Sequence, residues 1–177
     1  MNDPVLRAIR TRRVVRRMTA DPVGPDQLEA ILAAAGRAPS AGNRRLQRFV
    51  VVEDPLDIRL LRMVSPGMIQ KPAAVVLICI DWRRVDSFRL PRQNKGVYVD
   101  VGAAMQTMLL AAHAIGLGAG PVASFSRAAV RELLGLPDGL SPEVLVCLGH
   151  PAPDDIAPMR RGQRHGWREV TDWERPR

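Results

Sequence analysis

Aromatic side chains and lysine are scarce in this 177-residue sequence. Aromatic residues make up 4% of the chain, and only Lys71 and Lys95 among its 26 basic residues are lysines, the rest being arginine. The net charge is nevertheless +8. Surfaces that bind nucleic acid without sequence preference usually mix lysine with arginine and interleave aromatic side chains for base stacking. The composition therefore makes nucleic acid an unlikely partner and leaves the arginines to be explained.

Long hydrophobic runs and a cysteine framework are also absent. The longest apolar stretch in the first half spans residues 73–80, too short to cross a bilayer. The N-terminus lacks the apolar core of a signal peptide, so we expect a cytoplasmic protein without a membrane partner. Cys79 and Cys147 each lie within an apolar run, which predicts small buried side chains and neither a disulfide nor a metal site.

The usual catalytic constellations are missing as well. None of His113, His150 and His165 has a carboxylate or cysteine at metal-ligand spacing, so no metal site is expected. His113 falls in an apolar helical stretch and is interpreted as a hydrogen-bonded core histidine. The glycines of residues 116–120 follow a predicted helix and no strand, which disfavours a dinucleotide-binding turn. No catalytic side chain is predicted.

The hydrophobic periodicity predicts an α+β domain. Helices are expected over residues 4–10, 25–36, 56–64, 99–115 and 126–134, and strands over residues 49–52, 73–80 and 143–149. Residues 81–96 are polar and basic and are expected to form a connection. We expect residues 1–177 to form a single domain, with residues 152–177 as a C-terminal arm that packs on a partner subunit.

Arginines cluster near the N-terminus, and a turn-rich loop follows them. Arg12, Arg13, Arg16 and Arg17 fall within six residues, and residues 39–43 read Pro-Ser-Ala-Gly-Asn. Arginine forks bind phosphate oxygens in bidentate fashion, and hydroxyl and amide groups on a turn can reach the polar edge of a planar ring. The pattern is compatible with a site for a phosphorylated cofactor and, equally, with a solvated basic face.

Six motifs together resemble the nitroreductase family of flavin mononucleotide (FMN) enzymes, in order and at family spacing. They lie at residues 9–18 (IRTRRVVRRM), 34–43 (AAGRAPSAGN), 48–55 (RFVVVEDP), 100–118, 133–137 and 144–151. The resemblance implies an α+β three-layer sandwich, with a central mixed sheet flanked by helices. It also implies a domain-exchanged homodimer with FMN at the subunit interface. The implied activity is ping-pong transfer of a hydride from NAD(P)H through flavin N5 to a small acceptor such as a nitroaromatic or a quinone.

The resemblance also implies which residues contact FMN. Those expected at the cofactor are Arg12, Arg13, Val14, Arg16, Pro39, Ser40, Ala41, Asn43, Pro121, Val122, Ala123, Ser124 and one of Arg161 or Arg164. Arg12 and the late arginine would bind the phosphate, and Arg16 would approach the ribityl chain or the pyrimidine edge. The 39–43 loop would come from the other subunit, and residues 121–124 would pass beside the ring.

This sequence departs from the family pattern by three replacements and by the stretch of residues 81–99, which is too short for the helical lid of the larger members. Val14 replaces a serine, Arg45-Leu46-Gln47 replaces a Gln-Pro-aromatic run, and Ala123-Ser124 replaces an acidic-glycine pair. Two alternatives therefore stand beside the oxidoreductase: an enzyme of the same fold that uses reduced flavin for flavin destruction or dehalogenation, and a basic, non-enzymatic binding module with a degenerate flavin site.

Overall fold

The computed structural model describes residues 3–153 and 166–173 of the chain. These residues form six α-helices, four strands and two short 3-10 helices. In chain order the elements are α1 (Pro4–Thr11), α2 (Pro25–Gly36), η1 (Ala41–Asn43), β1 (Gln47–Val52), α3 (Pro55–Met63), β2 (Ala74–Asp81), α4 (Trp82–Ser87), α5 (Gly96–Ala114), β3 (Gly118–Val122), α6 (Arg127–Leu133), β4 (Leu140–Gly149) and η2 (Trp167–Val170). Each predicted helix and strand is present, with its ends shifted by a few residues.

The four strands form one sheet in the order β1-β2-β4-β3, and every neighbouring pair in it is antiparallel. The expectation of a mixed sheet is therefore wrong for the described residues. The central strand β2 has no exposed residue, and Val76 lies between Val51 of β1 and Val146 of β4. Burial on both faces explains why its sequence shows no polar alternation.

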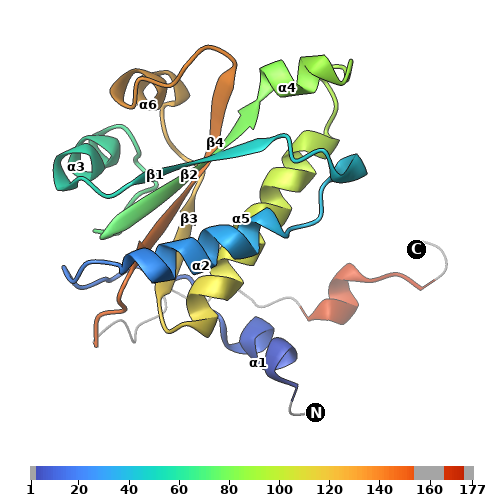
Figure 1. The fold of residues 1–177 in the computed structure, drawn as a ribbon. Coiled ribbons are helices and arrows are strands. Elements are labelled where there is room, and N and C mark those ends of the chain that lie inside the picture. Colours follow the sequence, from blue (N-terminus) through green and yellow to red (C-terminus); the bar gives the residue numbers. More distant parts are fainter. Residues whose placement is uncertain (1–2, 154–165, 174–177) are drawn as a thin grey trace.

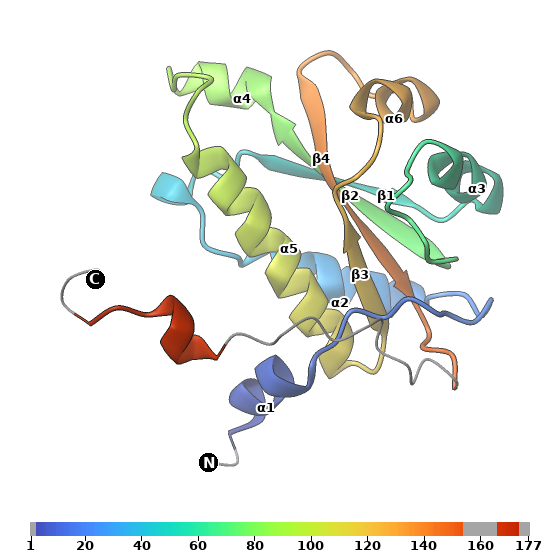
Figure 2. The same ribbon diagram turned by 180° about the vertical axis from the view of Figure 1, so that it is seen from behind.

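Helices cover both faces of the sheet, which confirms the three-layer sandwich. Helices α2 and α5 pack on one face, and α3 and α6 lie on the other, as the two opposite views show (Figures 1 and 2). Successive residues of β2 point to opposite layers: Ile78 joins the core under α2 and α5, whereas Leu77 and Cys79 join the core under α3 and α6. Cys79 and Cys147 are both buried and free, as predicted.

The sequence analysis missed two elements, α4 and β3. Helix α4 begins directly after Asp81, whose carboxylate caps it by accepting a hydrogen bond from the Arg84 N–H (3.1 Å). Strand β3 reads Gly-Ala-Gly-Pro-Val, a composition with low strand propensity. It is a strand because β4 pairs with it along one side, with Gly120 opposite Cys147. Tertiary pairing overrides local preference here.

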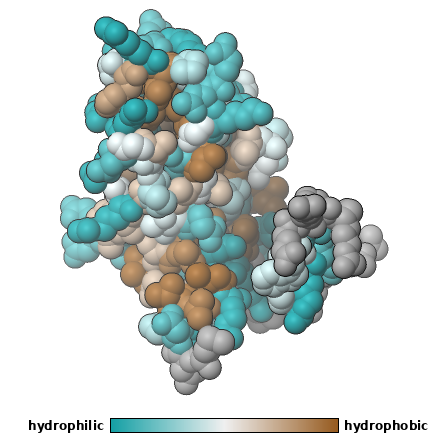
Figure 3. Space-filling model, turned by 90° about the vertical axis from the view of Figure 1, so that its right-hand side faces the viewer, coloured by the Kyte–Doolittle hydropathy of each residue, from teal (hydrophilic) through white to brown (hydrophobic). Residues whose placement is uncertain are grey.

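Apolar side chains remain exposed on one side of the molecule. Helix α1 has no buried residue, and its Val5, Leu6 and Ile9 are exposed. Figure 3 shows hydrophobic surface gathered over α1, in the lower part of the view. Val99 of α5 is 69% exposed. Within the described residues, no helix is long and apolar enough to cross a membrane.

Candidate functional site

The arginine-rich segment after α1 runs along the outer edge of β3. The Val15 N–H donates to the Ala119 carbonyl (3.0 Å), and the Thr19 N–H donates to the His150 carbonyl (2.9 Å). Met18 forms an isolated antiparallel bridge with Pro151. These contacts place the first motif beside the strand that leads into residues 121–124, so the two predicted parts of the cofactor site are neighbours.

Two glycines of β3 allow this close approach. A Cβ atom on Gly118 would lie 2.7 Å from Val15 Cγ1, and one on Gly120 would lie 3.1 Å from the Val15 carbonyl oxygen. On Gly120 it would also collide with the side-chain amide of Gln70, which is only 2% exposed. Distances below about 3.4 Å require the neighbour to move, and here that neighbour includes backbone. Glycine at 118 and 120 therefore fixes the first motif against the sheet.

Arg12 carries the charge best placed to receive an anion. It follows the last residue of α1, and its N–H closes the helix on the Ala8 carbonyl (2.9 Å). Within the described part of the chain, its Nε and Nη1 atoms are shielded from solvent and have no hydrogen-bond partner. A buried guanidinium without a partner is costly unless an anion completes it. Arg12 could therefore hold an anionic group such as a phosphate.

The other predicted residues of this cluster take different positions. Arg13 is exposed, and Val14 and Arg16 are half-buried. The Val122 side chain is buried in the core under α3 and α6, so only its backbone can face a ligand. Ala123 and Ser124 are exposed.

A short loop holds the turn after β3. The Ser124 carbonyl accepts a hydrogen bond from the Gly67 N–H (3.1 Å). The preceding Val64 carbonyl accepts one from the Ser126 N–H (2.9 Å). The loop before β2 thus fixes the backbone that the family resemblance places beside the flavin ring.

The predicted Pro-Ser-x-x-Asn loop forms a second cluster at the start of α5. The Ala41 N–H donates to both carboxylate oxygens of Asp100 (3.0 and 3.3 Å). The Ser40 hydroxyl oxygen accepts from the Arg45 N–H (3.3 Å). Asn43 is exposed with a φ of 52°, a left-handed conformation that asparagine tolerates better than most residues. Asp100, 4% exposed, therefore anchors a loop that presents Pro39, Ser40, Ala41 and Asn43 outward.

The two clusters lie at opposite ends of α5 (Figures 1 and 2). The loop contacts this helix through Asp100, whereas the first motif contacts it through Thr11 and His113. Thirteen residues of α-helix separate these contacts, a rise of about 20 Å. One copy of the chain thus separates the residues that the resemblance assigns to one cofactor, and a second copy can supply the missing cluster.

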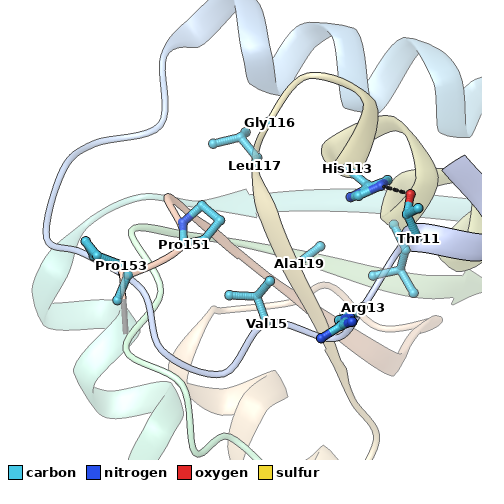
Figure 4. Close-up of a pocket in the computed structure, with 11 residues that line it drawn as sticks. Thr11, Arg13, Val15, His113, Gly116, Leu117, Ala119, Pro151 and Pro153 are labelled. Atoms are coloured by element: carbon cyan, nitrogen blue, oxygen red, sulfur yellow. Dashed lines mark hydrogen bonds between the residues drawn. The ribbon is translucent and has the colours of Figure 1, made fainter. Parts of the chain in front are cut away.

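A hollow of about 380 Å³ opens next to the first motif. Figure 4 shows Arg13, Val15, His113 and Ala119 around it. His113 is half-buried, and its Nε2 lies 2.8 Å from the Thr11 hydroxyl oxygen. Because that hydroxyl already donates to the Arg7 carbonyl (2.9 Å), the Nε2–H of His113 is the donor in this pair. The interpretation of His113 as a core histidine is therefore only half right, since it joins α1 to α5 at the wall of a hollow.

Two predicted residues are not described by the structure, and two residues that support the site were not predicted. Arg161 and Arg164 lie outside the described residues. Asp100 and Gln70 were not predicted as supports for the site. Asp100 could have been found as the single acidic residue of an otherwise apolar helix, whereas the contact between Gln70 and Gly120 spans fifty residues and leaves no local signal.

The sequence and the fold are both similar to those of known proteins. The sequence profile of the nitroreductase family matches residues 9–150. The chain is 32% identical to an NADH dehydrogenase of Thermus thermophilus, over 85% of this chain and 90% of the relative. It is 30% identical to an NADPH-flavin oxidoreductase of Vibrio harveyi, over 85% and 67%. A nitroreductase-like protein of Desulfovibrio desulfuricans, solved in complex with FMN, superimposes with a TM-score of 0.82 at 30% identity, and the match covers 100% of both chains.

Proposed function

Because this chain belongs to the nitroreductase family, we propose that it is an FMN-dependent oxidoreductase that takes electrons from NAD(P)H and passes them to a small oxidised acceptor. The observation that carries the proposal is Arg12: its Nε and Nη1 atoms are shielded and have no hydrogen-bond partner among the described residues. It precedes Val15, which pairs with Ala119 of β3. FMN, when bound, supplies hydride chemistry at its N5 atom.

The protein's own residues bind and orient the cofactor. Arg12 binds the phosphate, because a guanidinium fork matches two phosphate oxygens. Arg16 lies four residues further along the same segment and brings a cation toward the ribityl chain or the pyrimidine edge, where negative charge develops on reduction. The backbone of residues 121–124 passes beside the ring, where Val122 contributes only main-chain groups.

We also propose that the functional unit is a homodimer. The apolar side chains of Val5, Leu6 and Ile9 on α1, together with Val99 on α5, are exposed in the isolated chain, and a second copy would bury them. The separation of the two clusters by the length of α5 gives that copy a chemical role, because its 39–43 loop completes the site. The C-terminal arm predicted over residues 152–177 would pack on that copy; the structure describes only residues 152–153 and 166–173 of it, where Trp167, Val170 and Trp173 are exposed.

An absorbance spectrum tests the proposed function. The purified protein is expected to be yellow, or to turn yellow on addition of FMN, and NAD(P)H under anaerobic conditions is expected to bleach the flavin band. A quinone or nitroaromatic added afterwards should restore the band. Colourless protein that takes up no added FMN, or a flavin band that neither NADH nor NADPH bleaches, would contradict the proposal.

A further inference from the structure

Positive charge is concentrated in two short segments of the chain. Residues 44–48 and 81–95 contain eight arginines and lysines against two aspartates. These twenty residues therefore hold a net charge of +6 out of the +8 of the whole sequence. Like charges gathered on one surface repel each other and weaken the fold, so the concentration requires a physical explanation.

The two segments form one surface, which we call the basic rim. The Arg84 Nε donates to the Arg44 carbonyl (3.1 Å), and the Arg44 guanidinium lies over the Phe88 ring, 5.2 Å from its centroid. Arg48 pairs with Asp81 across the same junction (3.2 Å). These contacts tie α4 to the loop that precedes β1.

Most cations of the basic rim have no carboxylate partner in the described part of the chain. Its two aspartates are each paired once, Asp81 with Arg48 and Asp86 with Arg92 (2.7 Å). Within residues 3–153 and 166–173, the remaining basic side chains form no ion pair; they are Arg44, Arg45, Arg83, Arg84, Arg89 and Lys95. All of these except Arg44 are exposed.

The basic rim adjoins the loop that presents Ser40 and Asn43. The rim begins directly after Asn43, and the Arg45 N–H fixes it to the same loop by donating to the Ser40 hydroxyl oxygen (3.3 Å). A cofactor that touches this loop therefore lies within side-chain reach of the rim. A donor that reaches a cofactor held against this loop therefore comes close to these arginines.

We propose that the basic rim recruits the nicotinamide donor and selects its 2′-phosphorylated form, NADPH, over NADH. The inference rests on the proposed function and extends it. Nitroaromatics and quinones carry no obligatory charge, so the donor is the only diffusing reactant that is necessarily a polyanion. Its 2′-phosphate adds a charge of about −1.5 to −2 at pH 7, which arginine forks bind in bidentate fashion. Among relatives of this chain, one is named for NADH and another for NADPH, so homology leaves the choice open.

The aromatic residues of the rim favour a dinucleotide over single-stranded nucleic acid. A nucleic-acid platform needs free aromatic faces on which successive bases can stack. Here Phe88 has the Arg44 guanidinium over its ring, and Trp82 has that of Arg92 at 5.6 Å. One face of each ring is thus covered by a guanidinium group and is closed to a base.

Charge-neutral variants of the rim test the proposal. The double variant Arg45→Gln/Arg89→Gln removes two exposed, unpaired cations from the rim. The matched control, Arg59→Gln/Arg131→Gln, removes the same net charge from α3 and α6, which lie on the other side of the sheet (Figure 1). The first measurement is the second-order rate constant for anaerobic bleaching of bound FMN by NADPH and by NADH, at 20 and 200 mM salt.

We expect the native enzyme to react at least about tenfold faster with NADPH than with NADH at low salt, within the range of electrostatic steering. Higher salt should reduce this preference, because a shorter Debye length screens the exposed charges. The rim variant should lose most of the preference, and the control should keep it. Equal rate constants for the two donors in the native enzyme, or equal losses in both double variants, would overturn the proposal.

A binding measurement separates this inference from the proposed function. Calorimetric titration with adenosine 2′,5′-bisphosphate and with 5′-AMP requires neither FMN nor turnover. The native protein should bind the bisphosphate at least about tenfold more tightly than 5′-AMP, and the rim variant should not; such a ratio follows from one additional charged phosphate contact. Equal affinities would refute the donor site even if the flavin chemistry is confirmed, and tighter binding of oligothymidylate than of the bisphosphate at 150 mM salt would assign the rim to nucleic acid.

Discussion

Arg12 is half-buried, and its Nε and Nη1 have no partner in the described part of the chain. The substitution Arg12→Ala is expected to weaken FMN binding by about 1.5–3 kcal/mol, the range for hydrogen bonds to charged groups. Fluorescence titration of FMN into the apoprotein measures the change. Arg10→Ala is the control, because Arg10 is exposed on α1 two residues away; a similar loss in both variants, or none in Arg12→Ala, would remove the phosphate assignment.

Cys79 and Cys147 provide a second test at the scale of single residues. Burial raises the pKa of both thiols to about 12, with an added contribution from Glu143 at Cys79. The reactive form of cysteine is the thiolate, which is scarce wherever the pH lies well below that pKa. At pH 8 the native protein should therefore leave a thiol-specific disulfide reagent unconsumed, and denaturant should release two reactive thiols. Rapid reaction of the native protein would show that these strands open readily.

At the scale of elements, the contact between the first motif and β3 can be broken by one methyl group. A Cβ on Gly120 would meet the Val15 carbonyl oxygen and the Gln70 amide. Gly120→Ala should lower the free energy of unfolding by about 1–3 kcal/mol, as for other overpacked sites, and should weaken FMN binding because Arg12 shifts with the segment. Thermal melts and FMN titration measure both effects.

The control for this variant is Gly36→Ala at the end of α2. No atom lies within 4 Å of the Cβ that it would introduce. It should leave FMN affinity unchanged and stability equal or slightly higher, because alanine costs less conformational entropy than glycine. If Gly120→Ala behaves like Gly36→Ala, the segment does not depend on close approach to β3.

The same elements show how far the sequence alone could lead. Helices α1 and α3 were predictable because Asp3 and Asp54 cap them directly before a proline, a local signal. Strand β2 was predictable from its uninterrupted apolar run. Strand β3 was not predictable, because its glycines allow a close contact with Val15, which lies about one hundred positions earlier in the chain.

The sequence was enough to predict which segments form the candidate site. It was not enough to predict the contacts that hold these segments in position. The arginine motif and the 39–43 loop could be found from short patterns. Their placement at opposite ends of α5 depends on the tertiary contacts of Thr11 with His113 and of Ala41 with Asp100. The expectation of a mixed sheet rested on the family resemblance alone. It was wrong for the described residues, because all four strands pair antiparallel.

At the scale of the whole molecule, the separation of the clusters makes a prediction about subunit mixing. Arg12→Ala disables one cluster, and Asn43→Ala disables the other. If each site combines one cluster from each copy, a mixed dimer of the two variants contains one site with both defects and one intact site. Statistical mixing of the two variants should therefore restore about one quarter of the native FMN sites, as twofold symmetry requires.

The experiment is read as the FMN bound after the two purified variants are unfolded together and refolded. Each variant refolded alone serves as the control, and neither should recover affinity. Recovery absent from the mixture, with dimers present by sedimentation, would place the whole site within one copy of the chain.

The path of the first motif along β3 has a consequence for how the protein is produced. Strand β3 pairs with β4 on one side. Its other side is an edge of the sheet, and the segment around Val15 covers that edge. An uncovered edge is a template for pairing with another chain. Since the covering segment also carries Arg12, a cell that is short of riboflavin should leave this edge poorly protected. The yield of recoverable protein, and its tendency to form inclusion bodies, should then follow the vitamin supply of the expression host.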